Sequence, residues 1–164
     1  MDADHPLQLH EERVQAEWID ANGHMNLAYY VLAFDHATDV LFDRLGIGNA
    51  YRAETGRAIF VLETHVTYER ELREGDPMRF TSQLLGVGPK KLHLFHAMYH
   101  AEAGFLAATN EILGVHVDLA LRRSQPFPEP ALSRLQALAE RHLSLGWPKQ
   151  AGRSIRLDRT PDPA

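Results

Sequence analysis

The feature that most constrains the fold of this chain is a long, strongly apolar helix predicted over residues 27–45. Its apolar positions recur at helical spacing and are Leu27, Val31, Phe34, Thr38, Leu41 and Leu45. Four further residues widen the apolar surface: Tyr30, Ala33, Ala37 and Val40. Gly46 supplies a C-terminal stop, and the remaining polar stripe of Asp35, Asp39 and Asp43 is expected to face water or a basic partner. We therefore expect other elements to cover most of this helix.

Strand-like segments dominate the chain after a loop expected around residues 48–56. These segments are rich in β-branched and aromatic residues and cover 57–70, 76–87, 90–101 and 105–118. Short breaks that contain glycine and proline separate them, which indicates antiparallel neighbours. Before the helix, residues 7–19 predict two short strands or one bulged strand, since the alternation of apolar residues slips once. A short amphipathic helix is predicted over residues 131–143.

This order of elements predicts an α+β fold in which one antiparallel sheet of about five strands wraps around one helix. At 164 residues the chain suits a single domain, here residues 1–145, with a weakly patterned tail over residues 146–164 that Trp147 anchors. A single sheet does not bury the helix on all sides. Pairing of two sheets edge to edge in a homodimer, or in a dimer of dimers, solves this and also covers the open edge of a long strand.

Composition excludes several classes of function. The chain has no cysteine, so disulfides, thiolate nucleophiles and cysteine-ligated zinc are excluded. A formal net charge of -5 argues against broad nucleic-acid binding. No apolar run approaches the ~18 to 20 residues of a membrane span, and the N-terminus lacks the pattern of a signal peptide. We therefore expect a cytoplasmic protein that binds neither nucleic acid nor membrane.

Residues 18–26 form the strongest candidate site. Asp20 ends a segment that alternates like a strand, and turn and capping residues then lead into the long helix. A carboxylate here faces the positive end of a helix dipole, where backbone N–H groups can bind an oxygen that gains negative charge during a reaction. The alternative is that Asp20 and Asn22 only shape a turn and cap the helix.

The same residues carry a resemblance to a known family. The run Asp20-Ala21-Asn22-Gly23-His24-Met25-Asn26, followed by Ala28-Tyr29-Tyr30 and Phe34, resembles the hotdog-fold acyl-CoA thioesterases of the 4-hydroxybenzoyl-CoA thioesterase-like group. The resemblance covers roughly residues 8–130. Segments 35–39, 61–65, 91–96, 108–111 and 116–118 are most similar to thioesterases associated with carnitine dehydrogenase, which act on betainyl-CoA.

The resemblance implies hydrolysis of an acyl-CoA thioester without metal or redox cofactor, at sites formed between two subunits. It implies that Asp20 is either the nucleophile or the base that activates water, and both routes stay open. Backbone N–H groups of Leu27 and Ala28 are expected to polarise the thioester oxygen. The substrate-binding residues are then expected to be Asn22, Gly23, His24, Asn26, Leu27, Ala28 and Tyr29. Trp18, Tyr29 and Tyr30 offer aromatic faces that suit a quaternary ammonium acyl group, or they serve only core packing.

Two more groups of residues are candidates for the site. Glu63 and His65 are predicted on the same strand face as Ile59 and Val61, an apolar setting that favours an acid–base pair. The alternative is an outward polar pair on a half-exposed strand. Glu63 is therefore a second catalytic candidate, and with His65 it leaves open a hydratase or dehydratase. The contacts expected for the CoA phosphates are Lys90, Lys91, Arg122 and Arg123. The alternative is that these residues only lie in solvated turns. A binding module without catalysis is the remaining alternative.

The histidines at 93, 96 and 100 do not predict a metal site, although ten histidines in 164 residues is a high count. On a strand, His93 points opposite to His96. His96 and His100 lie ~13 Å apart at ~3.3 Å per residue, which is too far for a shared ion with bonds near ~2 Å.

Overall fold

The computed structural model describes residues 5–157. The strands are β1 (Leu7–Arg13), β2 (Arg57–Tyr68), β3 (Pro77–Val87), β4 (Lys91–His100), β5 (Leu106–Asp118) and β6 (Arg123–Ser124). The helices are α1 (Leu27–Leu45), α2 (Asn49–Thr55) and α3 (Glu129–Leu143), and a short 3₁₀ helix, η1, covers Ala16–Trp18. In the part of the chain described, no helix is long and apolar enough to cross a membrane.

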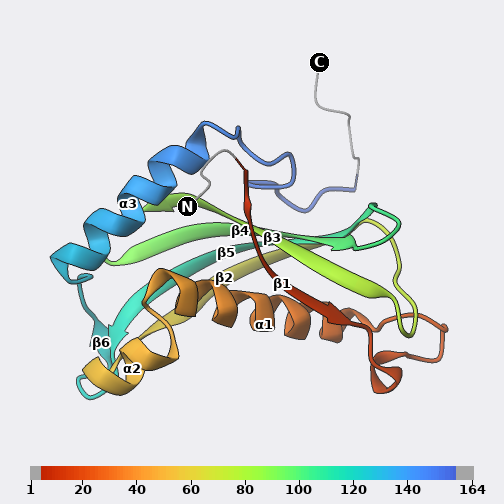
Figure 1. Cartoon of the computed structure of the whole chain (residues 1–164), viewed down its shortest axis with the longest axis horizontal. Coiled ribbons are helices and arrows are strands. Elements are labelled where there is room, and N and C mark those ends of the chain that lie inside the picture. The colour runs from red at the N-terminus through yellow and green to blue at the C-terminus, as the bar shows by residue number, and fades with distance from the viewer. Residues whose placement is uncertain (1–4, 158–164) are drawn as a thin grey trace.

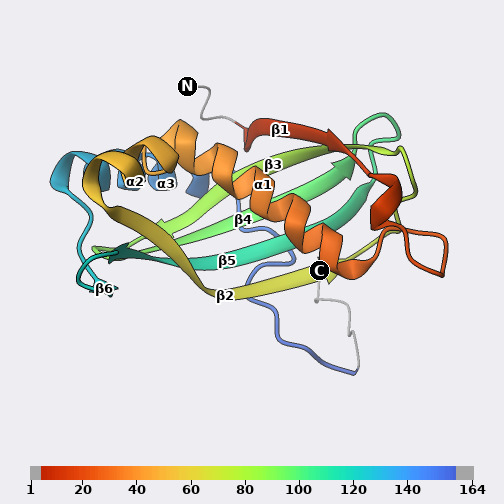
Figure 2. The same ribbon diagram turned by 90° about the horizontal axis from the view of Figure 1, so that it is seen from below.

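All the strands belong to one antiparallel sheet in the order β1-β3-β4-β5-β2, with the two-residue β6 paired to β5. The sheet curls around α1, which lies across one of its faces (Figures 1 and 2). This arrangement confirms the predicted α+β class, the hotdog fold that the resemblance implies, and the count of about five strands. β1 and β2 are the two edge strands, so each leaves one row of backbone groups unpaired within the sheet.

Helix α1 has the predicted boundaries because its two ends are capped by the expected residues. Asn26 caps the N-terminus through its side chain, and Gly46 ends the helix with φ +71°, a left-handed conformation that glycine adopts without strain. One face of α1 is buried against the sheet, with Phe34 and Leu41 fully covered. The opposite face stays open in the single chain, since Leu27 is 63% exposed and Asp35, Asp39 and Asp43 all face outward.

A polar group is buried between α1 and the sheet. The ring of His96 on β4 bonds the Ser82 hydroxyl at 2.8 Å and the Thr38 hydroxyl at 3.1 Å, so both ring nitrogens have partners. Complete burial lowers the pKa of His96 to about 3, and the ring is therefore neutral at physiological pH. Because His96 faces α1, cross-strand partners in its row, including Asn110 and Val66, also face α1.

The N-terminal segment differs from the prediction for residues 14–18. β1 carries a bulge between Gln8 and His10, which accounts for the slip of register in the sequence. The alternative of one bulged strand is therefore confirmed over residues 7–13. Beyond Arg13, however, the chain forms η1 and no second strand, so the extension of strand structure to residue 19 is wrong. The chain must turn from the sheet edge to the start of α1, and a 3₁₀ turn closed by Trp18 N–H to the Gln15 carbonyl at 3.0 Å achieves this while burying Trp18.

The loop expected around residues 48–56 is instead the short helix α2, which ends at Gly56. None of its residues is buried. Its sequence therefore lacks the apolar periodicity from which helices are predicted.

β2 also contains a bulge, and this bulge corrects the predicted face of Glu63 and His65. The register with β5 shifts between Val61 and Glu63, so Leu62 is an extra residue. Ile59 and Val61 consequently face α1, whereas Glu63 and His65 lie on the other face of the sheet, opposite Leu113 and Glu111 of β5. The apolar setting shared with Ile59 and Val61 is therefore wrong, and the alternative of an outward polar pair is confirmed.

The segment after β5 covers two further parts of the sheet. α3 lies along β3 beyond the end of β1, where β3 has no neighbouring strand on that side. There the Leu84 N–H donates a hydrogen bond to His142 Nδ1 at 2.9 Å. Residues 145–151 then cross the face away from α1, and Ala151 packs there with Leu85 and Phe95. Trp147 stays half exposed, although its indole N–H donates to the Ala151 carbonyl at 3.3 Å.

Candidate active site

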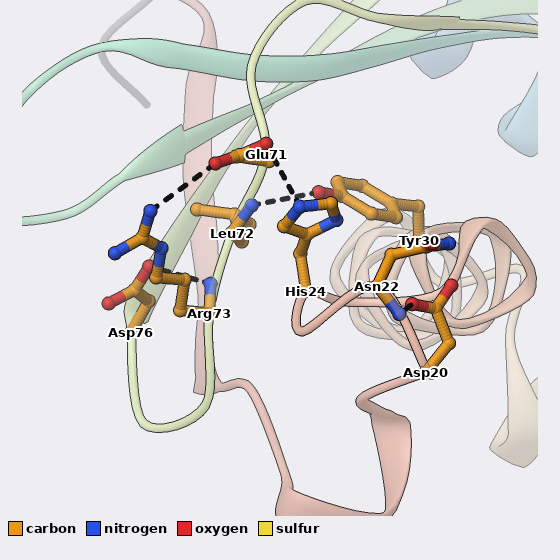
Figure 3. Close-up of polar contacts among 8 residues, drawn as sticks. All are labelled: Asp20, Asn22, His24, Tyr30, Glu71, Leu72, Arg73 and Asp76. Carbon is orange, nitrogen blue, oxygen red and sulfur yellow. Dashed lines mark hydrogen bonds and ion pairs between the residues drawn. The ribbon is translucent and has the colours of Figure 1, made fainter.

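Asp20 lies half-buried in a tight turn directly before α1, and its carboxylate accepts two hydrogen bonds. Figure 3 shows the one from Asn22. The Asn22 backbone N–H donates to Oδ1 at 2.8 Å, and the Asn26 amide donates to Oδ2 at 3.3 Å. Gly23 closes the turn with its N–H on the Asp20 carbonyl at 3.0 Å, and its φ of +82° explains why glycine occupies this position. The carboxylate is therefore fixed in orientation and retains acceptor capacity on both oxygens.

Asn26 links this turn to the helix. Its Oδ1 accepts the Ala28 N–H at 3.0 Å while its amide group reaches Asp20. Of the two backbone donors predicted for a substrate oxygen, Ala28 is thus already engaged in the helix cap. The Leu27 N–H has no acceptor among residues 5–157, so of these two donors only the Leu27 N–H is open at the start of α1.

The loop between β2 and β3 supports the turn from the side, and Glu71 in it is a residue that the sequence did not single out. The Met25 N–H donates to the Leu72 carbonyl at 2.8 Å, and the Leu72 N–H donates to the Tyr30 hydroxyl at 3.0 Å. Burial raises the pKa of Tyr30, which stays a neutral phenol. Glu71 Oε2 lies 3.2 Å from Nε2 of His24, so this carboxylate restrains the imidazole at the mouth of the turn (Figure 3).

Aromatic side chains surround the start of α1. Trp18 stacks on Tyr29 with ring centroids 5.6 Å apart and an interplanar angle of 11°. Tyr68, at the end of β2, donates its hydroxyl to the Leu27 carbonyl at 3.3 Å and meets Tyr30 edge to face. Trp18 is buried and Tyr29 is half-buried, so Tyr29 is the aromatic residue of the stacked pair more open to a ligand.

The remaining predicted residues lie away from Asp20 within one chain. Glu63 and His65 sit on the sheet face opposite α1, so they do not form a constellation with the turn. Lys90 and Lys91 follow β3, Arg122 and Arg123 follow β5, and all four are exposed at the end of the sheet where α1 finishes. The 19 residues of α1 separate that end from Asp20 by about 28 Å.

The predicted histidines 93, 96 and 100 have three separate environments. His93 pairs with Glu111 at 2.7 Å on the outer face of the sheet, His96 is buried under α1, and His100 lies 3.6 Å from Asp76 at the end of β4. As the strand geometry predicted, these three side chains do not converge on one point.

The fold and this turn define a class of protein, and sequence comparison agrees. Residues 14–135 match the family model described as the thioesterase-like superfamily. The chain therefore belongs to the thioesterase-like superfamily and is by class an acyl-CoA thioesterase. The match includes the whole of the Asp20 turn and α1.

Individual relatives narrow the comparison. The chain is 40% identical over 151 residues to a betainyl-CoA thioesterase of Pseudomonas aeruginosa, which covers 92% of this chain and 95% of that protein. It is 35% identical over 155 residues to an L-carnitine dehydrogenase/betainyl-CoA thioesterase of Rhizobium meliloti, where it spans 94% of its own length and 31% of the relative.

Solved structures show the same fold. A hypothetical protein of Staphylococcus aureus in complex with CoA superimposes with a TM-score of 0.84 at 30% identity, covering 94% of this chain and 98% of that one. A putative thioesterase of Pseudomonas putida gives a TM-score of 0.79 at 33% identity, covering 93% and 97%.

Proposed function

We propose that this protein hydrolyses betainyl-CoA to betaine and CoA, with Asp20 as the reacting carboxylate. The observation that carries the proposal is the Asp20 turn: an oriented, half-buried carboxylate in the turn that leads into α1, whose first backbone N–H, that of Leu27, has no acceptor among residues 5–157. The 40% identity to a betainyl-CoA thioesterase over nearly the whole chain supports the choice of acyl group. The CoA bound in the Staphylococcus aureus structure supports CoA as the thiol part of the substrate.

The chemistry follows one of two routes. As a general base, Asp20 takes a proton from water, the water oxygen attacks the thioester carbon, the C–S bond breaks, and the proton passes from Asp20 to the CoA sulfur. As a nucleophile, the Asp20 carboxylate attacks the same carbon and expels CoA, and water then cleaves the resulting anhydride. In both routes the Leu27 N–H stabilises the negative charge on the thioester oxygen, a contribution typically worth about 3 to 4 kcal/mol.

The betainyl group places a quaternary ammonium only a few bonds from the reacting carbon. Its binding site must therefore adjoin Asp20, and Tyr29 offers an aromatic face there, backed by Trp18. The outward stripe of Asp35 and Asp39 adds negative charge on the open face of α1. Burial and the negative charge of the neighbouring Asp35 raise the pKa of Asp39. The carboxylates of this stripe are therefore close enough to interact.

We propose a homodimer in which the β2 strands of two copies pair antiparallel. The edge of β2 is unusually apolar for a solvated strand, with Phe60, Val61 and Leu62 each at least half exposed. A two-fold axis near the centre of β2 sets Arg57 of one copy beside Tyr68 of the other. Arg57 lies opposite Asp118 at the end of β5 in the strand register, whereas the Tyr68 hydroxyl donates to the Leu27 carbonyl at the start of α1.

This dimer gives the predicted basic residues a role. The turns that carry Lys90, Lys91, Arg122 and Arg123 lie about 28 Å from Asp20 of their own chain, but the two-fold pairing brings them toward the Asp20 turn of the other copy. We therefore assign the CoA phosphates to basic side chains from the second subunit.

The test is release of CoA thiol from betainyl-CoA, with 3,3-dimethylbutyryl-CoA as a control substrate of the same shape and no charge. The proposed cation site predicts a clear preference for betainyl-CoA, and Asp20→Asn should lower kcat by about 10²- to 10⁴-fold. Turnover in water enriched in ¹⁸O separates the routes, because only the anhydride route places label in the Asp20 carboxylate. Equal rates for Asp20→Asn and wild type would refute the assignment of Asp20.

A further inference from the structure

A second cluster of reactive side chains lies between β1 and α1, away from the Asp20 turn. His10 Nε2 is 3.3 Å from Glu12 Oε1, and His36 Nδ1 is 3.1 Å from Glu12 Oε2. The three ligand-type atoms of this cluster lie within 4.8 Å of one another. Within residues 5–157, this is the one group of three such side chains that converges in this way.

The bulge in β1 explains why these polar side chains point inward. His10 and Glu12 are paired with Phe80 and Met78 of β3, which pack beneath α1, so both side chains face the helix. They are 19% and 16% exposed, while His36 is 41% exposed. The cluster is therefore closed on the sheet side and open to solvent through His36.

Two atoms of the cluster lack hydrogen bonds. His10 Nε2 and Glu12 Oε1 are both buried and face each other at 3.3 Å, yet neither has a hydrogen-bond partner. Buried polar atoms without partners are rare in folded proteins and call for an explanation. Glu12 directs one oxygen toward each histidine, an arrangement that one cation between the three side chains would satisfy.

We propose that His10, Glu12 and His36 bind a divalent transition metal ion, with Zn²⁺ as the best match. Two imidazoles and a carboxylate are ligands that Zn²⁺ accepts, whereas Mg²⁺ and Ca²⁺ prefer oxygen. Bonds of about 2.0 to 2.2 Å place ligand atoms roughly 3 to 4 Å apart, and both measured pairs fall in this range. A fourth position remains open toward solvent.

The proposed ion has a structural role. His36 lies nine residues after Leu27, about 14 Å along α1 from the helix start, so the ion is remote from the thioester. The ion ties the edge strand β1 to α1. It does not take part in the hydrolysis, and the proposal stands independently of the substrate.

The experiment uses full-length protein without a histidine tag, treated with chelator and then titrated with Zn²⁺ by calorimetry and with Co²⁺ by visible absorption. We expect one ion per chain, and a rise in melting temperature with Zn²⁺ concentration. His36→Gln should weaken binding at least about 10- to 100-fold and abolish the thermal shift. His93→Gln, which alters a histidine paired with Glu111 on the other face, is the matched control and should bind as the wild type does.

His36→Gln is the variant least expected to disturb folding, because His36 is the most exposed of the three ligands. Glu12→Gln and His10→Gln then test the buried pair. Substoichiometric uptake by the wild type would overturn the proposal, as would equal affinity in His36→Gln and wild type. Either result would leave His10 and Glu12 as inward polar groups that only protect an edge strand from pairing.

Discussion

Asn26 performs two functions through two different atoms, and its substitution separates them. Oδ1 caps α1 by accepting the Ala28 N–H at 3.0 Å, and Nδ2 orients Asp20 by donating at 3.3 Å. Serine is an equally good N-cap residue but is one bond shorter, so Asn26→Ser keeps the cap and loses the contact with Asp20. Asn26→Ala loses both. The pair of variants therefore distinguishes helix capping from positioning of the carboxylate.

The magnitudes follow from the two contacts. Loss of an N-cap costs about 1 kcal/mol, which lowers the melting temperature by roughly 2 to 4 °C in a domain of this size. A hydrogen bond to a charged group is worth about 1.5 to 3 kcal/mol, and the 3.3 Å contact belongs at the lower end. If that energy orients Asp20 in the transition state, its loss corresponds to roughly a 10-fold fall in kcat/KM.

The assays are thermal unfolding by circular dichroism and thiol release from betainyl-CoA. We expect Asn26→Ser to melt close to wild type with a kcat/KM about 10-fold lower, and Asn26→Ala to show the same loss of activity together with the lower melting temperature. A wild-type kcat/KM for Asn26→Ser would refute the positioning role of Asn26. A melting temperature as low as that of Asn26→Ala would refute the separation of the cap from the contact.

Three further predictions concern other parts of the molecule. Leu62→Lys, on the apolar edge of β2, should yield folded monomers in sedimentation and lower activity; an unchanged dimer would exclude this edge as the interface. Glu71→Gln removes the partner of His24 and should lower kcat/KM several-fold with under about 1 kcal/mol of lost stability, since the pair is partly exposed; full activity would show that this pair does not serve the turn. His96 has a pKa of about 3 in the folded chain against 6.5 unfolded, so its contribution to stability falls as pH drops below about 6.5, by about 2 kcal/mol at pH 5. Urea unfolding at pH 7 and pH 5 should show this loss in the wild type and less of it in His96→Gln, and equal losses would contradict the assignment to His96.

The sequence predicted those elements whose periodicity is long and uninterrupted. α1 has the predicted limits because 19 residues keep one helical period between a capping Asn26 and Gly46. The four long strands fall within one or two residues of their predicted ranges for the same reason, since alternation and glycine breaks agree. The Asp20 turn was found because its turn residues are contiguous in sequence.

The bulge in β2 and the contacts between distant segments were not predicted. One extra residue at Leu62 reverses the face of every following side chain on β2 without changing the composition, and Glu63 was therefore assigned to the wrong face. Glu71 pairs with His24, which lies far from it in the sequence, so no local sequence pattern predicts this contact. The hydrogen bond from the Ala28 N–H to Asn26 was likewise not predicted, because it depends on the position of one side-chain oxygen.

The two bulges explain together why the edges of the sheet differ. On β1 the bulge turns His10 and Glu12 inward, and inward polar groups make a strand a poor partner for another copy. On β2 the bulge falls at Leu62, within a run of exposed apolar residues whose burial at ~25 cal/mol per Å² favours association. The start of α1 lies beside β2 through Tyr68, so the edge suited to pairing is also the edge next to Asp20. The proposed dimer through β2 would therefore enclose Asp20, whereas the same pairing through β1 would leave it open to water.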